Sequence, residues 1–318
     1  MDKVKIAVLY GGPSAEHEVS VASAKNVLTQ LDTNKYDVIG ISITKAGLWV
    51  DDSSHQEFTE AEGLKYLQSS QVAMVFILIH GEYGEDGTIQ KLLEDNNIPF
   101  IGTGSEASAL AMDKVESSRV LTEAGLKVPR FVVGAWSDSG FSYPLVVKPT
   151  DRGSSVGITI VKDQSEFDGA IKTAHEFSDN IMIQEFIDGR ELTCGVIEGH
   201  DGKLIPLTPT EILPNKDHTF FDYDAKYVAG ASVEKTPPDL PEEMIIKIQN
   251  EAVVAHKALG CRHVSRADFI LSGDTLYTLE VNTLPGMTGT SLLPQGAKAA
   301  GIEFPELLDN IITAALNK

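Results

Sequence analysis

The chain contains 318 residues, a length that suggests two domains, with three small domains or one large domain also open. With glycine counted and tyrosine left out, about 48% of the residues are apolar, which excludes a disordered or fibrous chain. The 46 acidic residues outnumber the 26 basic residues and leave a formal net charge of −20. Such a charge repels nucleic acid and anionic membrane surfaces, so we expect neither as a partner.

The two cysteines, Cys194 and Cys261, form neither a disulfide framework nor the paired spacing of a metal site. We therefore expect two buried thiols in a protein of the reducing cytoplasm. The first apolar run, residues 6–10, is too short for a secretion signal. The longest apolar run, residues 72–79, suits a buried strand and is too short for a membrane span.

The N-terminal third of the chain alternates between strand-like and helix-like segments. Val21, Ala24, Leu28 and Leu31 recur at helical spacing between two apolar runs, which is the pattern of a β–α–β unit. We therefore expect a parallel sheet that ends before a glycine-rich hinge at residues 102–105. The apolar runs that would form its strands are residues 4–10, 38–43, 72–79 and 99–101.

After the hinge the pattern changes, so we expect no second doubly wound unit. A helix is predicted from residue 114 to residue 124, because Gly125 follows it. Short strands are expected at 145–148 and 158–161. Residues 208–241 have little periodicity and are predicted to be a long irregular loop that acts as a lid or binding loop. A long amphipathic helix that ends at Gly260 should follow, with an apolar stripe of Ile245, Ile248, Ala252, Ala255 and Leu259.

Residues 11–16 join the first strand to a helix, where a dinucleotide-binding domain would hold a pyrophosphate. The glycine spacing does not match that of a dinucleotide fingerprint, and Glu16 would place a carboxylate where phosphate belongs. If the turn binds a ligand, a cationic group such as an ammonium beside Glu16 fits better than a phosphate. Taken alone, the segment favours simple compensation of the helix dipole by Glu16.

Residues 151–157 form a glycine- and serine-rich turn between two strands and follow Lys148. Successive backbone N–H groups in such a turn can bind an anion, and the hydroxyl groups and the lysine add donors. The segment is not a Walker loop. The pattern therefore predicts contact with phosphate, with a bare hairpin turn as the alternative.

A predicted hairpin carries Arg266, Asp268, Glu280 and Asn282. If Gly273 is the centre of the turn, Arg266 faces Glu280, Asp268 lies diagonal to Glu280, and all four side chains share one face. Three oxygen ligands beside an arginine suit Mg²⁺ that holds nucleotide phosphates, whereas a solvated strand face with an ion pair is the alternative. The opposite face would supply the core with Ala267, Phe269, Leu279 and Val281.

Six segments carry recognisable motifs in one order and cover nearly the whole chain: residues 11–20, 80–88, 112–114, 148–157, 221–227 and 280–292. Together they resemble the motifs of D-alanine:D-alanine ligases of the ATP-grasp superfamily. The resemblance implies an α/β fold of three domains, with ATP held between the central and C-terminal domains. The expected domains are 1–104, a Rossmann-like substrate domain, 105–190, a central ATP-grasp subdomain, and 191–318, a C-terminal subdomain with the metal site and a lid loop at 208–231.

The resemblance also implies the ligands of ATP and of two Mg²⁺ or Mn²⁺ ions. Three lysines would bind phosphates, the loop after Lys148 would close over them, and one stretch of backbone would hold adenine beside a ribose-binding carboxylate. The implied ATP-binding residues are Lys114, Lys148, Gly153, Ser155, Val156, Gln184, Glu185, Phe186, Ile187, Glu191 and Lys226. The implied metal ligands are Asp268, Glu280 and Asn282, with Glu280 bridging the two ions.

For the substrates, the resemblance implies that Glu16 meets the ammonium of the first D-alanine, with His80 nearby. Ser154 and Tyr227 would link that site to the loop, while Arg266 and the Gly286 N–H would stabilise the tetrahedral oxyanion. The carboxylate of the second D-alanine would meet Ser291 and Leu292 at a helix start.

The implied reaction converts the first D-alanine to an acyl phosphate, which the amine of the second D-alanine attacks to make D-alanyl-D-alanine for peptidoglycan precursors. The alternatives are a D-alanine:D-lactate or D-alanine:D-serine ligase, and a non-catalytic nucleotide-binding protein on the same fold. The resemblance also implies a homodimer. His263 and Ser265 depart from the family pattern before Arg266, and Gln184 replaces a carboxylate that some members carry, although an amide oxygen can also accept from adenine.

Overall fold

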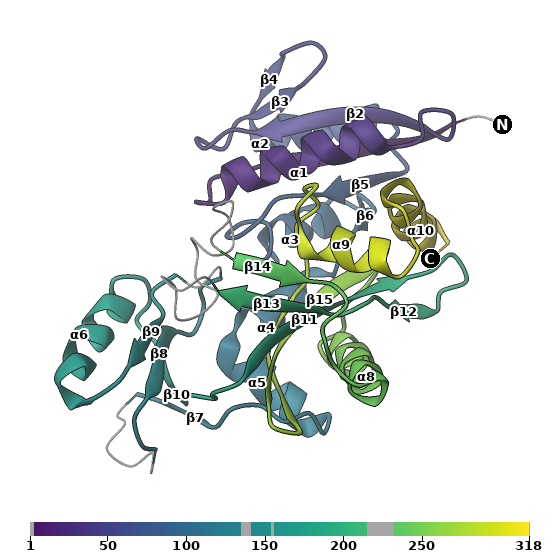
Figure 1. The fold of residues 1–318 in the computed structure, drawn as a ribbon. Helices are drawn as coiled ribbons and strands as arrows, with labels where there is room; N and C mark the ends of the chain where they lie inside the picture. The colour runs from purple at the N-terminus through teal and green to yellow at the C-terminus, as the bar shows by residue number, and fades with distance from the viewer. Residues whose placement is uncertain (1–2, 135–140, 154–155, 215–231, 318) are drawn as a thin grey trace.

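The structure is a computed structural model that describes residues 3–134, 141–153, 156–214 and 232–317. Three sheets follow one another along the chain, and Figure 1 shows one at the N-terminal end, one in a lobe with α6, and one beside the C-terminal helices. Among the described residues, no helix is both long and apolar enough to cross a membrane.

The N-terminal sheet has the strand order β4-β3-β2-β1-β5-β6. Its neighbours from β2 to β6 pair in parallel, as the alternating pattern predicts. The sheet is nevertheless mixed, because β3 and β4 add an antiparallel edge that we did not expect from the sequence. Its elements are β1 (Val4–Gly11), α1 (His17–Gln30), β2 (Tyr36–Ile43), β3 (Trp49–Asp51), β4 (Glu57–Phe58), α2 (Glu60–Ser69), β5 (Met74–Ile77), α3 (Thr88–Asp95) and β6 (Phe100–Ile101).

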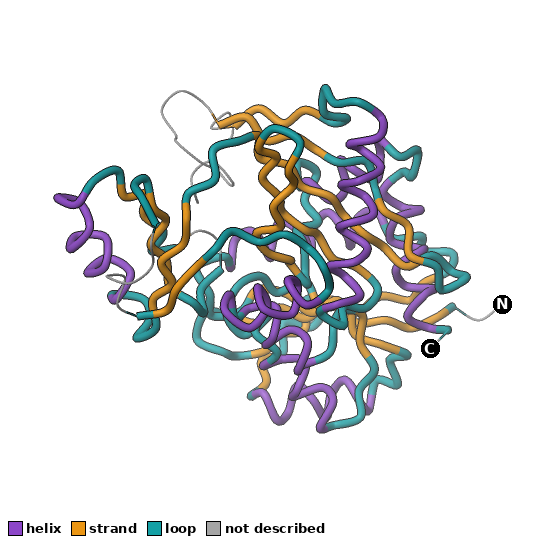
Figure 2. Tube along the Cα trace, turned by 90° about the horizontal axis from the view of Figure 1, so that it is seen from below, coloured by secondary structure: helices purple, strands orange, loops and turns teal. Residues whose placement is uncertain are grey.

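The second sheet is antiparallel, with the order β7-β10-β8-β9, which confirms that the parallel pattern does not repeat. Helix α6 packs on it through a core of its own that includes Leu145, Val147, Phe167 and Ile183. Figures 1 and 2 both show this lobe standing apart from the other sheets. The elements of this region are α4 (Ser105–Met112), α5 (Lys114–Glu123), β7 (Phe131–Val133), β8 (Leu145–Pro149), β9 (Thr159–Val161), α6 (Gln164–His175) and β10 (Ile181–Glu185).

The third sheet has the order β14-β13-β11-β15-β16, with β12 paired to β11. The prediction of one irregular loop over 208–241 is wrong at both ends, because β13 and β14 pair antiparallel, with Ile212 opposite Glu234. Residues 215–231 of that segment lie outside the described residues. The elements are β11 (Arg190–Glu198), β12 (Leu204–Pro206), β13 (Thr210–Pro214), β14 (Ser232–Lys235), α8 (Glu242–Ala258), β15 (Val264–Ser272), β16 (Thr275–Asn282), α9 (Leu292–Ala299) and α10 (Phe304–Leu316).

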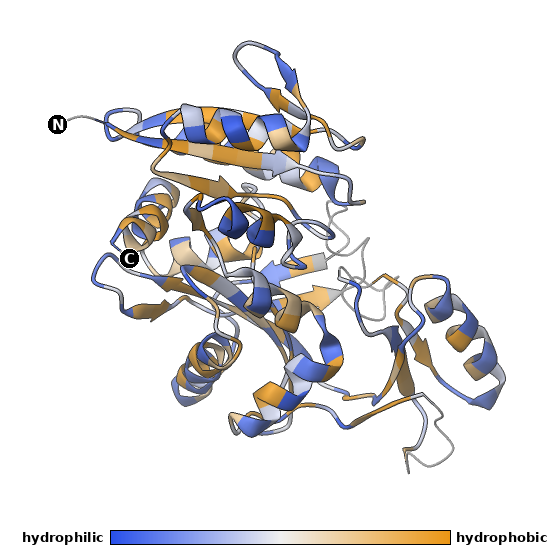
Figure 3. Cartoon of the chain, turned by 180° about the vertical axis from the view of Figure 1, so that it is seen from behind, coloured by the Kyte–Doolittle hydropathy of each residue, from blue (hydrophilic) through white to orange (hydrophobic). Residues whose placement is uncertain are grey.

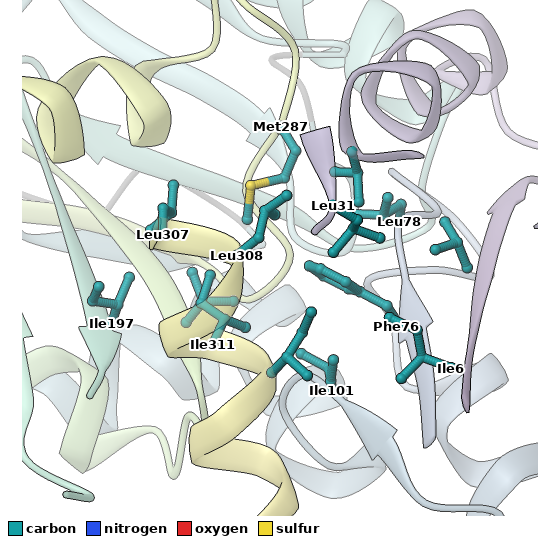
Figure 4. Close-up of a cluster of buried hydrophobic side chains, with 14 of the residues drawn as sticks. Ile6, Leu31, Phe76, Leu78, Ile101, Ile197, Met287, Leu307, Leu308 and Ile311 are labelled. Carbon is teal, nitrogen blue, oxygen red and sulfur yellow. The ribbon is translucent and has the colours of Figure 1, made fainter. Parts of the chain in front are cut away.

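One hydrophobic core joins the N-terminal sheet to the third sheet. Figure 4 shows Leu308 and Ile311 of α10 between Ile197 of β11 and Phe76 of the N-terminal sheet. The strands of the N-terminal sheet are predominantly hydrophobic in Figure 3, whereas the helices carry residues of both kinds. Because both sheets pack on the same helix, the loops at their ends are held in fixed positions relative to each other.

Candidate active site

The turn from β1 to α1 places Glu16 in a buried position. Gly11 has a φ of 89°, and a Cβ there would lie 2.3 Å from the carbonyl oxygen of Ile43, so only glycine fits. Glu16 precedes α1 and is 7% exposed. Its backbone N–H donates to Ser14 Oγ (3.1 Å), and that hydroxyl donates to the His80 carbonyl (2.6 Å). Glu16 and His80 thus line the same cavity of about 500 Å³.

His80 connects the N-terminal sheet to the loop after β16. Its Nε2 lies 3.0 Å from Ser23 Oγ on α1, and its Nδ1 lies 3.1 Å from the carbonyl oxygen of Leu284. The same Nδ1 is 3.6 Å from Glu85, a carboxylate that we did not identify from the sequence. Burial raises the pKa of Glu85, and the negative charge of Glu16 adds to that shift.

The far wall of this cavity comes from the segment that follows β16. Arg266, Asn282, Gly286, Ser291 and Leu292 all line it, so the predicted oxyanion and second-substrate residues share a cavity with Glu16. Leu292 is the first residue of α9, and the N–H groups of Leu292 and Leu293 precede the first N–H that bonds within the helix, that of Gln295 (3.2 Å to the Ser291 carbonyl). N–H groups at such a helix start favour an anion.

The hairpin of β15 and β16 has a different register from the one predicted. Ser272 pairs with Thr275 across a two-residue turn, Arg266 pairs with Asn282, and Asp268 pairs directly with Glu280. The predicted pairing of Arg266 with Glu280 is therefore wrong, because the turn centre lies between Gly273 and Asp274 and a bulge follows.

The bulge inserts Leu279 between the partners of Asp268 and Phe269. Leu279 consequently lines a cavity with Asp268 and Glu280, and the prediction that it belongs to the core face is wrong. Thr278 takes the buried position instead, with 0% exposure. Ala267, Phe269 and Val281 do lie in the core.

Asp268 accepts hydrogen bonds from three neighbouring side chains. The Arg266 guanidinium bonds both carboxylate oxygens at 3.0 Å, Thr193 Oγ1 donates at 2.5 Å, and Asn282 Nδ2 donates at 3.3 Å. The ion pair of Arg266 is thus with Asp268 of its own strand. Glu280 instead lies 3.5 Å from Lys114 Nζ.

The donor set of this hairpin fits a hard divalent cation. Asp268 and Glu280 are like charges directly opposite each other, an arrangement that destabilises a sheet unless a cation compensates it. Among the described residues no three His, Cys, Asp or Glu side chains converge on one point, so the third donor to such a cation would have to be the Asn282 amide oxygen.

Two lysines flank the hairpin from the central region. Lys114 follows Asp113, whose side chain caps α5 by accepting from Val115 N (2.9 Å) and Glu116 N (3.0 Å). Lys114 Nζ donates to the Arg152 carbonyl (2.7 Å), which ties it to the glycine-rich turn.

Lys148 of β8 is buried, and its Nζ donates to Gln184 Oε1 (2.9 Å). Burial, together with the positive charge of Lys114, lowers the pKa of Lys148 to about 8. The predicted adenine-binding stretch lies beside it, because a cavity of about 140 Å³ is lined by Lys148, Gln184, Glu185, Phe186, Ile187 and Glu191. The Glu185 side chain pairs with Arg130 (2.8 Å), and the Glu185 backbone N–H donates to the Arg130 carbonyl (2.9 Å).

Three neighbouring cavities share lining residues, and the shared residues include two of the predicted metal ligands, Glu280 and Asn282. Asn282 and Glu85 line both the large cavity and a small middle one, and Glu280 lines both the middle cavity and the one beside Lys148. Lys114 and Gly153 also line the middle cavity. A phosphoryl group could thus pass from a ligand beside Lys148 to a ligand beside Glu16 at the hairpin carboxylates.

Not every predicted residue can be placed. Ser154, Ser155, Lys226 and Tyr227 lie outside the described residues. Val156 is described, and its backbone N–H donates to the Gly153 carbonyl (3.2 Å) in the predicted phosphate turn.

Comparisons with known proteins agree over nearly the full length. Residues 5–103 match the family model described as D-ala D-ala ligase N-terminus, and residues 120–313 match the model for its C-terminus. The D-alanine–D-alanine ligase of Halalkalibacterium halodurans is 39% identical, over 99% of this chain and 100% of that protein. D-alanine–D-alanine ligase A of Mesorhizobium japonicum is 37% identical, over 99% and 98%.

Solved structures give the same result. The VanG D-Ala:D-Ser ligase of Enterococcus faecalis has a TM-score of 0.84 and 33% identity, and the match covers 99% of this chain and 100% of that one. The D-alanine–D-alanine ligase of Bacillus anthracis, complexed with ATP, has a TM-score of 0.81 and 30% identity, over 99% and 98%.

Proposed function

The chain belongs to the D-alanine–D-alanine ligase family, and we propose that it joins two D-alanine molecules while ATP is cleaved to ADP and phosphate. The observation that carries this proposal is the row of three cavities that meet at Glu280 and Asn282. The product, D-alanyl-D-alanine, would serve peptidoglycan precursor synthesis.

The reaction requires activation, because a carboxylate does not form an amide with an amine at neutral pH. Phosphoryl transfer from ATP would convert the first D-alanine to an acyl phosphate, with Lys114, Lys148 and Lys226 neutralising the phosphates. The amine of the second D-alanine, after it has lost a proton, would then attack the acyl carbon, and Arg266 and the Gly286 N–H would stabilise the oxyanion. Collapse of this intermediate would break the C–O bond to phosphate, which leaves as the amide forms.

We propose that the first D-alanine places its ammonium beside Glu16, near His80, and that Ser154 and Tyr227 close over it. The second D-alanine would place its carboxylate against Ser291 and Leu292. The support for these roles is that the described members, Glu16, His80, Ser291 and Leu292, line one cavity.

For the nucleotide, we propose that ATP occupies the cavity beside Lys148, with adenine at 184–187, the ribose at Glu191, and the phosphates under Gly153, Ser155 and Val156. Asp268, Glu280 and Asn282 would hold two Mg²⁺ or Mn²⁺ ions. Bound ions would neutralise charge that develops on the transferred phosphoryl group.

We keep the domain limits 1–104, 105–190 and 191–318 as a proposal, supported by the presence of one sheet in each range. A homodimer in the cytoplasm is likewise proposed, and sedimentation velocity tests the dimer.

A D-alanine:D-serine ligase is the second candidate, because the chain shares its fold and 33% of its sequence with the VanG D-Ala:D-Ser ligase (TM-score 0.84). The experiment is ADP release with D-alanine, L-alanine or no amino acid, followed by mass spectrometry of products from D-alanine mixed with D-serine or D-lactate. We expect ADP release that depends on D-alanine and mainly D-alanyl-D-alanine. ADP release that is independent of any amino acid would refute the ligase assignment.

A further inference from the structure

Glu234 is a wall residue of the large cavity that has no role in the reaction described above. It lies on β14, is partly buried, and lines the cavity together with Thr290, Ser291 and Leu292. Its backbone is held by pairing with Ile212 of β13, and Ile212 packs in turn on Leu292, the first residue of α9. Strand β14 is thus attached to the start of α9 by a hydrophobic contact as well as by Glu234.

Gln295 joins Glu234 to the loop before α9. Its Nε2 carries two hydrogens and makes two hydrogen bonds, one to Glu234 Oε2 and one to the carbonyl oxygen of Thr290 (2.8 Å). Its backbone N–H donates to the Ser291 carbonyl (3.2 Å). Gln295 of α9 therefore holds Thr290 and Ser291, the last residues of the loop before the helix. Its bond to Glu234 connects the same side chain to the sheet.

The loop itself is tightly folded between two attachments. Ser291 Oγ accepts from Thr288 N (3.0 Å), and a Cβ at Gly286 would lie 2.7 Å from Ser291 Oγ. At its other end, Asn26 Nδ2 on α1 donates to the Met287 carbonyl (2.8 Å). The position of Ser291 and Leu292 thus depends on α1 at one end and on Gln295 at the other.

We propose that Glu234 and Gln295 form a positioning pair that fixes this loop, so that Ser291 and the N-terminus of α9 receive the carboxylate of the second amino acid. The inference rests on the proposed function. Neither residue touches the reacting atoms in this scheme. Their loss should weaken binding of the second amino acid, because a displaced loop no longer presents its donors at the right distance.

The test compares variants in initial rates of ADP release, with D-alanine varied over a range wide enough to resolve two KM values. Gln295→Met removes both side-chain hydrogen bonds at similar size, and we expect the KM of the second D-alanine to rise on the order of 10-fold. The KM of ATP and of the first D-alanine should change less than about 2-fold, because ATP would occupy the cavity beside Lys148 and the first D-alanine would lie at Glu16, away from Gln295.

The variants Glu234→Gln and Glu234→Leu show whether Glu234 acts as a hydrogen-bond acceptor or through its negative charge. The amide oxygen of Glu234→Gln can still accept from Gln295, so this variant should stay near wild type, whereas Glu234→Leu should resemble Gln295→Met. The double variant Glu234→Leu with Gln295→Met should be little worse than either single variant, because the two residues act as one unit.

Gln249→Met is the matched control. Gln249 is also a partly buried glutamine whose Nε2 donates to a backbone carbonyl, that of Leu207 (3.0 Å), but it does not line the cavity. Its substitution should leave both KM values of D-alanine unchanged. Thermal unfolding of every variant checks the fold.

The proposed positioning role would be refuted if folded Gln295→Met kept the wild-type KM for the second D-alanine. It would also be refuted if the KM values of ATP and of both D-alanine molecules rose equally. Multiplicative effects of the two single substitutions would refute their action as a unit. Failure of the proposed function looks different, because the wild-type protein itself would then release no ADP in response to D-alanine.

Discussion

Glu280 lines both the small middle cavity and the cavity beside Lys148. It faces Asp268 across the hairpin and lies 3.5 Å from Lys114 Nζ. We expect Glu280→Gln to reduce kcat of ADP release by at least about 100-fold, because the neutral amide removes the charge that cations and lysine require. The fold should persist, since Glu280 lies on the site face and not in the core.

The check is ADP release together with thermal unfolding of the same sample. Thr193→Val serves as a comparison, because it removes a hydrogen bond to Asp268 (2.5 Å) without removing a charge. A folded Glu280→Gln variant with near-normal turnover would contradict the proposed cation site.

Both cysteines are buried, and burial raises the pKa of each thiol to about 12. A thiol with that pKa has almost no thiolate at neutral pH, and thiolate is the reactive form. We expect Cys194 and Cys261 to react with a disulfide reagent at least about 100 times more slowly in the native protein than in denaturant. Rapid labelling of native protein at pH 8 would show that one of them is accessible.

At the scale of elements, the short connection between β3 and β4 depends on Asp51. Its Oδ1 accepts from the backbone and hydroxyl groups of Ser53 and Ser54, and its Oδ2 accepts from the Tyr66 hydroxyl (2.5 Å). Burial alone would raise the pKa of Asp51, but these hydrogen bonds together hold it well below the ordinary value.

We expect Asp51→Ala to lower the free energy of unfolding by about 2 kcal/mol at pH 7, because the donors of Ser53, Ser54 and Tyr66 all lose their acceptor. A carboxyl with a depressed folded pKa contributes stability above its unfolded pKa, near 4, and loses it as the pH falls further. The difference between wild type and Asp51→Ala should therefore shrink below pH 4. Urea unfolding at pH 7 and pH 3.5 measures it, and an equal difference at both pH values would contradict the role of the charge.

The parallel strands and long helices could be predicted from the sequence because their apolar periodicity extends over many residues. Helix α5 begins at Lys114 and ends before Gly125, as predicted. The strands β3 and β4 could not be predicted, because two or three residues carry too little pattern. The pattern also cannot show a bulge, so the face of Leu279 and the pairing of Arg266 were predicted wrongly.

In the candidate site, too, some residues could be predicted from the sequence and others could not. Residues of contiguous motifs, such as Glu16, Lys148 and Asp268, could be predicted as candidates because each motif indicates its own chemistry. Glu234 was not, because it belongs to no motif and reaches the cavity only through the pairing of β13 and β14. Glu85 lies within the recognised segment 80–88, and its burial, visible only in the fold, would have singled it out.

At the scale of the whole molecule, the lobe with α6 has its own core, separate from the core around α10. We expect Phe167→Ala to speed hydrogen exchange of the amides in β8 and β10 and to leave those in β1 and β5 unchanged. Leu308→Ala should act on the other core and lower its stability by about 3 kcal/mol. Hydrogen exchange followed by mass spectrometry tests both, and equal acceleration throughout the chain in Phe167→Ala would contradict two separate units.

The core shared by α10 and the N-terminal sheet has a consequence for synthesis on the ribosome. Ile6 and Phe76 emerge early, yet their packing partners Leu308 and Ile311 lie in the last helix described. The part of this sheet face that α10 covers and α1 does not must therefore stay exposed until α10 has been translated. A nascent chain stalled before residue 304 should bind chaperones that recognise apolar surface, and this binding should cease once α10 has left the exit tunnel.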